Sequence, residues 1–285
     1  MILIADGGST KADWIALGSA KEELFRTTTL GLNPSVLTEQ EMLSTINNAD
    51  DLLKVQNDAL EVHFYGAGCG SPTAAKSLQH ILKLIFKKAT VFVSEDTLAA
   101  VYASAGNTPG IVCILGTGSN SCFYDGKSII TTAPSLGYTI MDEASGNYFG
   151  KTLLRDFYYN KMPEKMASAF KTSFDLDPDV VKMNLYKNPY PNMYLASFAK
   201  FMLKYKHEKY VRKIIKKGIQ EFFKYRILPF KKDKQTPIYF IGSIAYYFQD
   251  ILDNVASKNN LSIAKVIKRP IDNLVDFHRN SSFLK

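Results

Sequence analysis

Cysteine is scarce in this 285-residue chain, and long apolar runs are missing. The three cysteines, Cys69, Cys113 and Cys122, show no Cys-x-x-Cys spacing, and their odd number argues against a disulfide framework and against a zinc site. No stretch reaches the 18 or more apolar residues of a membrane span, and Asp6 interrupts the opening apolar run too early for a secretory signal. We therefore expect a cytoplasmic protein that does not bind membranes.

Internal repeats of 20 to 50 residues and low-complexity tracts are also missing. A hydrophobic content of 46% in 285 residues is enough for a large core and two domains of ordinary size. The net charge of +8 is concentrated in residues 200–234, where thirteen Lys or Arg face only Glu208, Glu221 and Asp233. This segment is typical of amphipathic helices with a solvated basic face; an anion-binding surface is the alternative. No Arg-rich or aromatic motif supports a nucleic-acid partner.

Glycine is used in a specific pattern at the ends of three apolar strands. Segments 1–14 and 111–120 each run from a strand into a glycine pair with hydroxyl side chains, and 238–241 runs into a glycine that opens a helix. Bare backbone N–H groups in such turns bind small anions. One such junction is typical of a plain turn, whereas three in this order indicate a site for nucleotide phosphates. The residues concerned are Gly7, Gly8, Ser9, Thr10 and Lys11, then Gly116, Thr117, Gly118 and Ser119, then Gly242 and Ser243.

The order of these motifs resembles the sugar kinase, Hsp70 and actin superfamily. Within it, the chain is similar to the N-acetylglucosamine kinase and BadF/BadG/BcrA/BcrD ATPase branch. The resemblance spans nearly the whole chain, except for about residues 151–235. Further matching segments are 31–34, 94–96, 136–137, 142–146 and 269–274.

The resemblance implies an α/β fold with two similar ribonuclease H-like domains, the actin-like ATPase fold, and a cleft between them. The N-terminal domain would comprise 1–106, joined by a C-terminal helix at 271–285, and the second domain 107–270 with a helical insertion at about 151–235. Strands alternating with helices support this class. We expect strands near 2–5, 14–17, 62–65 and 91–94, helices near 39–55, 73–88 and 96–105, and a strand near 262–267.

The catalytic residues follow from the resemblance. It implies ATP and Mg²⁺ as cofactors, Asp96 as the general base that accepts the proton of the attacking hydroxyl, and Asp6 as the magnesium-holding carboxylate. Taken alone, Asp96 is more typical of a helix N-cap and Asp6 of an ordinary Asp-Gly turn, and it is the resemblance that favours the catalytic roles. Lys11 would contact a phosphate, or is simply solvated.

Sugar recognition is assigned to six residues by the same resemblance. Asn and Asp side chains can form paired hydrogen bonds with sugar hydroxyls. Taken alone, the two Asn residues are also typical of turns, and Asp142 with Glu143 could be a solvated acidic pair that caps a helix near Ser145. The predicted substrate-binding residues are Asn33, Asp96, Ser119, Asn120, Gly137 and Asp142.

The favoured activity is phosphorylation of N-acetylglucosamine at its 6-hydroxyl by a homodimeric enzyme. Leu136, Met141 and Ala144 depart from the family pattern, which keeps N-acetylmuramate, glucosamine and other hexoses open as substrates. An ATPase that activates an electron-transfer partner through an iron–sulfur cluster is a second hypothesis. A non-catalytic sensor of nucleotide or sugar is a third.

Overall fold

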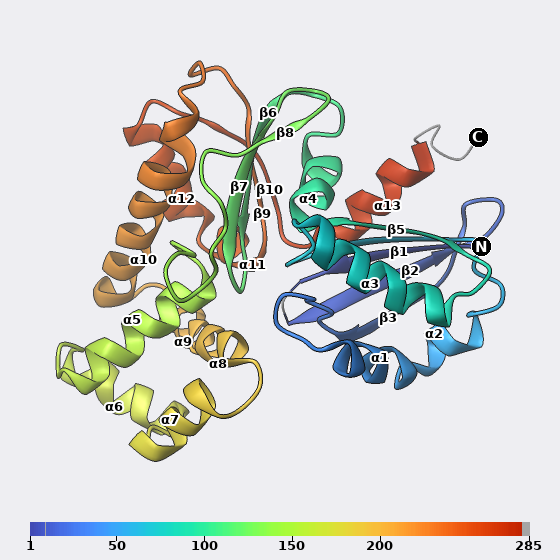
Figure 1. Cartoon of the computed structure of the whole chain (residues 1–285). Helices are drawn as coiled ribbons and strands as arrows, with labels where there is room; N and C mark the ends of the chain where they lie inside the picture. Colours follow the sequence, from blue (N-terminus) through green and yellow to red (C-terminus); the bar gives the residue numbers. More distant parts are fainter. Residues whose placement is uncertain (9, 281–285) are drawn as a thin grey trace. The chain divides into compact units, whose positions relative to one another are not determined.

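The computed structural model describes residues 1–8 and 10–280. Its contacts divide the chain into two units: Met1–Asn107 with 269–280, called unit 1, and Thr108–Lys268, called unit 2. Each unit is built on one five-stranded mixed sheet (Figure 1).

The sheet of unit 1 has the order β3-β2-β1-β4-β5. Its first three strands form an antiparallel meander, and β4 and β5 run parallel to β1. The sequence patterns did not predict β3, an edge strand rich in threonine whose burial pattern is weak. The strands are β1 (Ile2–Gly7), β2 (Lys11–Leu17), β3 (Glu23–Leu30), β4 (Glu61–Gly66) and β5 (Thr90–Glu95).

Helices cover both faces of this sheet (Figure 1). One face packs Ile4 and Ile15 against α4 and α13, and α1 to α3 lie on the other face. The helix predicted over 39–55 is instead two helices, interrupted at residues 48–49. The helices are α1 (Glu39–Asn47), α2 (Asp50–Lys54), α3 (Pro72–Ile85), α4 (Asp96–Ser104) and α13 (Ile271–Asn280).

The sheet of unit 2 repeats the topology of the first. Its order is β10-β9-β6-β7-β8, in which β6 to β8 are antiparallel and β9 and β10 run parallel to β6. This duplication confirms the predicted α/β class. The strands are β6 (Gly110–Leu115), β7 (Ser119–Tyr124), β8 (Ile129–Ile130), β9 (Ile238–Ile241) and β10 (Ile263–Ile267).

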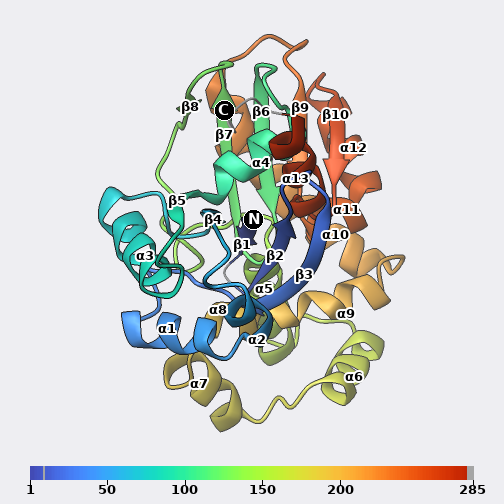
Figure 2. The ribbon, with the colours of Figure 1, turned by 90° about the vertical axis from the view of Figure 1, so that its right-hand side faces the viewer.

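The core of unit 2 joins β6 and β9 to a large helical cluster, with Cys113 and Phe240 fully buried. Figures 1 and 2 show α5 to α9 gathered beyond one end of the sheet. The helices are α5 (Gly146–Tyr158), α6 (Glu164–Ser173), α7 (Pro178–Tyr186), α8 (Pro191–Ser197), α9 (Ala199–Lys204), α10 (Lys209–Phe222), a π-helix (Phe223–Ile227), a 3₁₀-helix (Leu228–Phe230), α11 (Ser243–Tyr247) and α12 (Gln249–Lys258).

Across residues 1–8 and 10–280, none of the helices has both the length and the apolar character needed to cross a bilayer.

Candidate active site

Two predicted catalytic carboxylates lie at one edge of the sheet in unit 1. Because β1, β4 and β5 are parallel, their carboxyl ends meet at the same edge, and the register pairs Asp6 with Tyr65 and Tyr65 with Ser94. Asp96 follows β5 directly as the first residue of α4. Burial raises the pKa of Asp6 to about 7, and the negative charges of Asp96 and Asp13 add to that rise. Asp96 is therefore close enough to Asp6 to affect the ionisation of Asp6.

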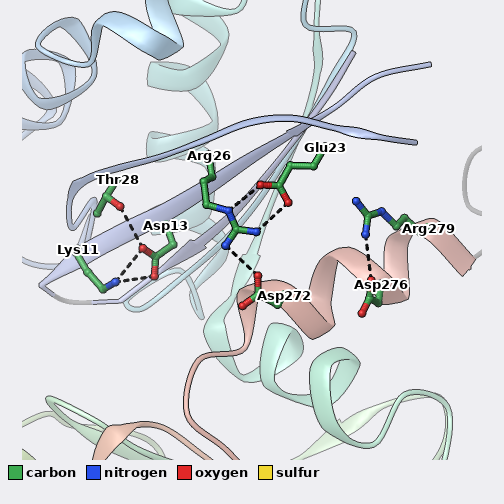
Figure 3. Close-up of polar contacts among 8 residues, drawn as sticks. All are labelled: Lys11, Asp13, Glu23, Arg26, Thr28, Asp272, Asp276 and Arg279. Carbon is green, nitrogen blue, oxygen red and sulfur yellow. Dashed lines mark hydrogen bonds and ion pairs between the residues drawn. The ribbon is translucent and has the colours of Figure 1, made fainter. Parts of the chain in front are cut away.

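Lys11 lies at the same end of the sheet, but its ammonium group is held by Asp13 (Figure 3). Lys11 Nζ is 2.8 Å from both carboxylate oxygens of Asp13, and the Thr28 hydroxyl donates to Asp13 Oδ1 over 3.3 Å. Asp13 is also directly opposite Asp6 in the β1–β2 register. The sequence prediction missed Asp13, although the i, i+2 spacing from Lys11 already places both side chains on one face of a strand.

The first glycine turn is shaped by close packing. A Cβ atom on Gly7 would lie 2.4 Å from Cζ of Phe64, so a larger residue would displace the ring. Gly8 is exposed, and the carbonyl of Thr10 accepts a hydrogen bond from Gly31 N over 3.0 Å. Ser9, a predicted phosphate contact, lies outside the described residues.

Asn33 has a clear structural role in unit 1. Its Oδ1 accepts a hydrogen bond from Ser35 N over 2.9 Å, which is the turn geometry expected for Asn before proline. A Cβ atom on Gly68 would lie 1.9 Å from the same oxygen, so the Asn33 turn packs directly on the β4–α3 loop. Its contact with a sugar stays a prediction.

In unit 2, the turn at Gly242 and Ser243, between β9 and α11, lies against the second glycine turn. Gly242 has φ of +116°, and a Cβ atom there would be 2.3 Å from the carbonyl oxygen of Leu115. Glycine is therefore required at this position. Ser243 is exposed at the first position of α11, and Gly116 has open space around its Cα. The fold thus brings residues 116–118 and 242–243 together from strands far apart in sequence.

Asp142 is a buried residue in contact with the second glycine turn. Its side chain is 5% exposed, its Oδ1 accepts a hydrogen bond from Ser119 N and its Oδ2 one from Asn147 Nδ2, both over 3.2 Å. Burial raises the pKa of its carboxyl group. The alternative of a solvated helix-capping acid is wrong, because α5 is capped by Ser145, whose Oγ accepts a hydrogen bond from Tyr148 N.

The other two predicted sugar contacts have local backbone roles. Asn120 Oδ1 accepts a hydrogen bond from Ser121 N over 2.9 Å. Gly137 has φ of +75°, and its carbonyl accepts a hydrogen bond from Met141 N over 2.9 Å, which closes a turn before Asp142.

Arg226 is a second residue that the sequence prediction missed. It belongs to the basic segment 200–234, yet it is 3% exposed and lies in the π-helix. Its Nε is 3.4 Å from Glu143 Oε2, and its Nη2 is 3.3 Å from Met141 Sδ. A buried guanidinium group therefore contacts both neighbours of Asp142. Nothing in the local sequence distinguishes it from the exposed lysines around it.

The donor set in unit 1 fits Mg²⁺. Magnesium prefers hard oxygen ligands and commonly binds one or two carboxylates together with substrate phosphates and water. The half-buried Asp6, with Asp13 and Asp96 near enough to raise its pKa, provides an anionic environment that a dication would stabilise. Within the described part of the chain, no group of three or more His, Cys, Asp or Glu side chains is arranged to hold a metal ion.

The structure matches solved proteins over its full length. A Porphyromonas gingivalis protein, described as a "Putative N-acetylglucosamine Kinase", is 32% identical with a TM-score of 0.91, and the match covers 99% of both chains. The chain belongs to this N-acetylglucosamine kinase-like family of sugar kinases. No protein-family model matches the sequence. No curated protein matches it either.

More distant structures share the fold of this sugar kinase family. A Chromobacterium violaceum protein with the same description is 14% identical with a TM-score of 0.72, and the match covers 97% of this chain and 98% of that one. A ROK family glucokinase from Streptomyces griseus, solved with glucose and AMPPNP, is 12% identical with a TM-score of 0.55, and 97% of each chain is covered. These two matches establish the actin-like sugar kinase fold alone.

Proposed function

We propose that this sugar kinase transfers the γ-phosphate of ATP to an amino sugar, with N-acetylglucosamine and its 6-hydroxyl as the first choice. The observation that carries the proposal is the pairing of Asp6 and Asp96 at one sheet edge in a chain that matches an N-acetylglucosamine kinase-like protein over 99% of its length. Family membership supports phosphate transfer to a sugar as the reaction. The two carboxylates support the carboxyl edge of the unit 1 sheet as the place where it occurs.

The chemistry requires few protein groups. The sugar hydroxyl attacks the γ-phosphorus, its proton passes to the carboxylate of Asp96, and the bond to the β–γ bridging oxygen breaks to release ADP. Asp6 would hold Mg²⁺, which neutralises phosphate charge when it is bound. Backbone N–H groups at 7–8 and 116–118 and the ammonium group of Lys11 would bind phosphate oxygens. Gly242 and Ser243 would line the nucleoside site.

Substrate recognition is assigned to Asn33, Ser119, Asn120, Gly137 and Asp142. The buried position of Asp142 supports a role in orientation, because its carboxylate retains acceptor capacity beyond the two described hydrogen bonds. We propose that the enzyme works in the cytoplasm as a homodimer.

The iron–sulfur ATPase hypothesis is less well supported. Cluster ligands are thiolates, and Cys69 was its accessible candidate. The side chain of Cys69 is only 4% exposed, and burial, with the charges of Asp96 and Glu95, raises its pKa to about 12. Cys113 and Cys122 are fully buried. The thiol of Cys69 is thus kept protonated, which disfavours a ligand role.

A phosphotransfer screen tests the proposal. The purified protein is incubated with ATP, Mg²⁺ and, separately, N-acetylglucosamine, N-acetylmannosamine, glucosamine, N-acetylmuramate and glucose. We expect ADP and a sugar monophosphate from an N-acetylated amino sugar, with ³¹P–¹H correlation placing the phosphate on O6. Transfer to glucose alone would contradict the amino-sugar assignment, and ADP release without any sugar phosphate would contradict the kinase assignment.

A further inference from the structure

The first turn of α5 is attached to the second glycine turn through the backbone. Gly146 N donates to the carbonyl of Gly116 over 2.8 Å, and Asn147 N donates to the carbonyl of Thr117 over 3.0 Å. These bonds use N–H groups that a helix N-terminus leaves without intrahelical partners. The 116–119 turn and the start of α5 are therefore one hydrogen-bonded element.

The side chain of Asn147 extends this element to Asp142. Its Nδ2 donates to Asp142 Oδ2, while Ser119 N donates to Oδ1 of the same carboxylate. Asn147 and Ser119 are each 2% exposed. A hydrogen bond to a buried carboxylate is stronger than one at the surface, so each of these two donors contributes strongly to the orientation of the carboxylate.

Asn147 is also costly to keep at this position. Its Oδ1 and the Ser119 hydroxyl are buried atoms that lack a hydrogen-bond partner among the described residues. Nearly all buried polar atoms in folded proteins are paired, and an apolar side chain of similar size would avoid the cost. What Asn147 provides in return is its hydrogen bond to Asp142.

We propose that Asn147 is a positioning residue of the kinase: it fixes the carboxylate of Asp142, a predicted sugar contact, relative to the predicted phosphate-binding turn at 116–119. This inference rests on the proposed function. Asn147 exchanges no proton with the substrate and acts only through Asp142. The acceptor sugar bound by that carboxylate is thereby held in a set position relative to the transferred phosphate.

The charges around Asp142 determine how its ionisation responds to loss of Asn147. Lys151 on α5 and Arg226 on the π-helix favour the ionised form, whereas burial opposes it and dominates. Glu143, the next residue in the chain, forms an ion pair with Arg226. Without the Asn147 donor, the carboxylate loses one of its two described hydrogen bonds, and protonation extends to higher pH.

The test compares Asn147→Leu and Asn147→Asp with Asn192→Leu. Asn192 is a matched control, because it is another buried asparagine in the first turn of a helix in unit 2. Steady-state kinetics with N-acetylglucosamine and ATP are measured from pH 5 to 9, alongside thermal unfolding. We expect N147L to raise the sugar KM at least about tenfold, as expected for loss of a hydrogen bond to a buried charge, and to move the acid limb of kcat/KM to higher pH. N147D moves it further, because two carboxylates then share one site.

The proposal would be overturned if N147L lowered thermal stability but left the sugar KM and the pH profile unchanged. N147L would then behave like the control N192L, and Asn147 would have a structural role only. If N147L does not fold, Asn147→Ala, which suits a helix and adds no bulk, is read in its place. If the wild-type protein phosphorylates no sugar, the proposed function fails separately. In that case AMPPNP titration tests the role of Asn147. We expect N147L to bind AMPPNP at least about fivefold more weakly, because Asp142 no longer links residue 147 to the predicted phosphate-binding turn. Unchanged AMPPNP affinity, or none in the wild type, would count against the inference.

Discussion

At the residue scale, the candidate site residues of the two units include carboxylates whose surroundings differ. Asp6 is half-buried beside two other acids, and its pKa rises to about 7. Asp142 is buried among hydrogen-bond donors. Lys11 is held by Asp13 over 2.8 Å, so its ammonium group must leave or share that partner to reach a phosphate. These differences in environment agree with the proposed roles of Asp6 in metal binding and of Asp142 in orienting the sugar.

Asp96→Asn tests the proposed general base. The variant keeps the size and helix-starting position of the side chain but cannot accept a proton. We expect kcat to fall by about 10²- to 10⁴-fold, while AMPPNP binding stays within about threefold of the wild type. The measurement is kcat by coupled ADP detection and nucleotide affinity by calorimetry. Asp276→Asn on α13, an exposed acid that pairs with Arg279, is the control and should keep full activity. Substantial turnover by Asp96→Asn would remove Asp96 from the mechanism.

At the scale of elements, the turns at Gly7 and Gly242, which we propose to bind nucleotide, depend on glycine because each passes close to a neighbouring residue. Gly242 joins β9 to α11 and leaves no room for a side chain beside Leu115. Gly106, at the end of α4, also has positive φ, but a Cβ atom there would meet nothing within 4 Å. The two positions therefore separate backbone strain from steric contact.

Gly242→Ala should destabilise the protein far more than Gly106→Ala. The control substitution costs about 1 kcal/mol from left-handed geometry alone, whereas Gly242→Ala adds a backbone clash and should cost more than about 3 kcal/mol. Urea unfolding measures both, and AMPPNP titration should show weaker binding for Gly242→Ala only. Equal effects of the two substitutions would contradict the predicted close approach of α11 to the phosphate turn.

The C-terminal helix α13 carries a titratable contact with its sheet. Burial, together with the neighbouring His63, lowers the pKa of His278 to about 4, and its Nε2 lies 2.9 Å from the Tyr65 hydroxyl. Figure 3 shows a second attachment of α13 to the sheet, in which Arg26 on β3 binds both Glu23 and Asp272. This second attachment is exposed and contributes little to stability.

The pKa of His278 predicts acid destabilisation of unit 1. The folded state favours the neutral ring, so the unfolded state binds more protons between about pH 6.5 and 4. The contribution of neutral His278 to the free energy of unfolding is fully present above about pH 6.5. It is lost as the pH falls, by up to about 3 kcal/mol near pH 4. Urea unfolding at pH 7, 6, 5 and 4.5 measures it, and His278→Gln should flatten the dependence. Parallel curves for the two proteins would show that His278 is not responsible.

At the scale of the whole molecule, one sheet topology is used twice, and in each copy glycine lies between the first two strands of the unit. The strand order β3-β2-β1-β4-β5 in unit 1 has its counterpart, read in the reverse direction, in β10-β9-β6-β7-β8 of unit 2. A ligand that binds these turns only in the folded state should stabilise the protein by mass action.

AMPPNP with Mg²⁺ should therefore stabilise the protein against heat. At a ligand concentration of about 100 times Kd, the gain is about 2.7 kcal/mol, which should raise the unfolding temperature by several degrees. EDTA should remove most of this gain, and Asp6→Asn should lose the dependence on Mg²⁺. Differential scanning fluorimetry checks all three. Equal stabilisation with and without Mg²⁺ in the wild type would contradict the metal role of Asp6.

Sequence patterns predicted most elements because those elements depend on neighbouring residues. Apolar runs before Gly7 and Gly116 predicted buried strands, and Ser145 predicted the start of α5. They missed β3, whose polar edge residues carry a weak pattern, and they treated Arg226 as part of a solvated face. The partner of Arg226 is 83 residues away in the chain, so no local pattern could reveal it.

The sequence by itself determined the two glycine turns and the strands that precede them, because backbone freedom at glycine and burial of apolar runs act over a few adjacent residues. Only the tertiary structure decided that Asp13 lies opposite Asp6, that Ser119 donates to Asp142, and that Arg226 is buried against Glu143. These contacts depend on strand register and on helix packing across long stretches of chain. Ionisation and hydrogen bonding at the site are set by those distant neighbours, since burial and nearby charge fix the pKa of each group.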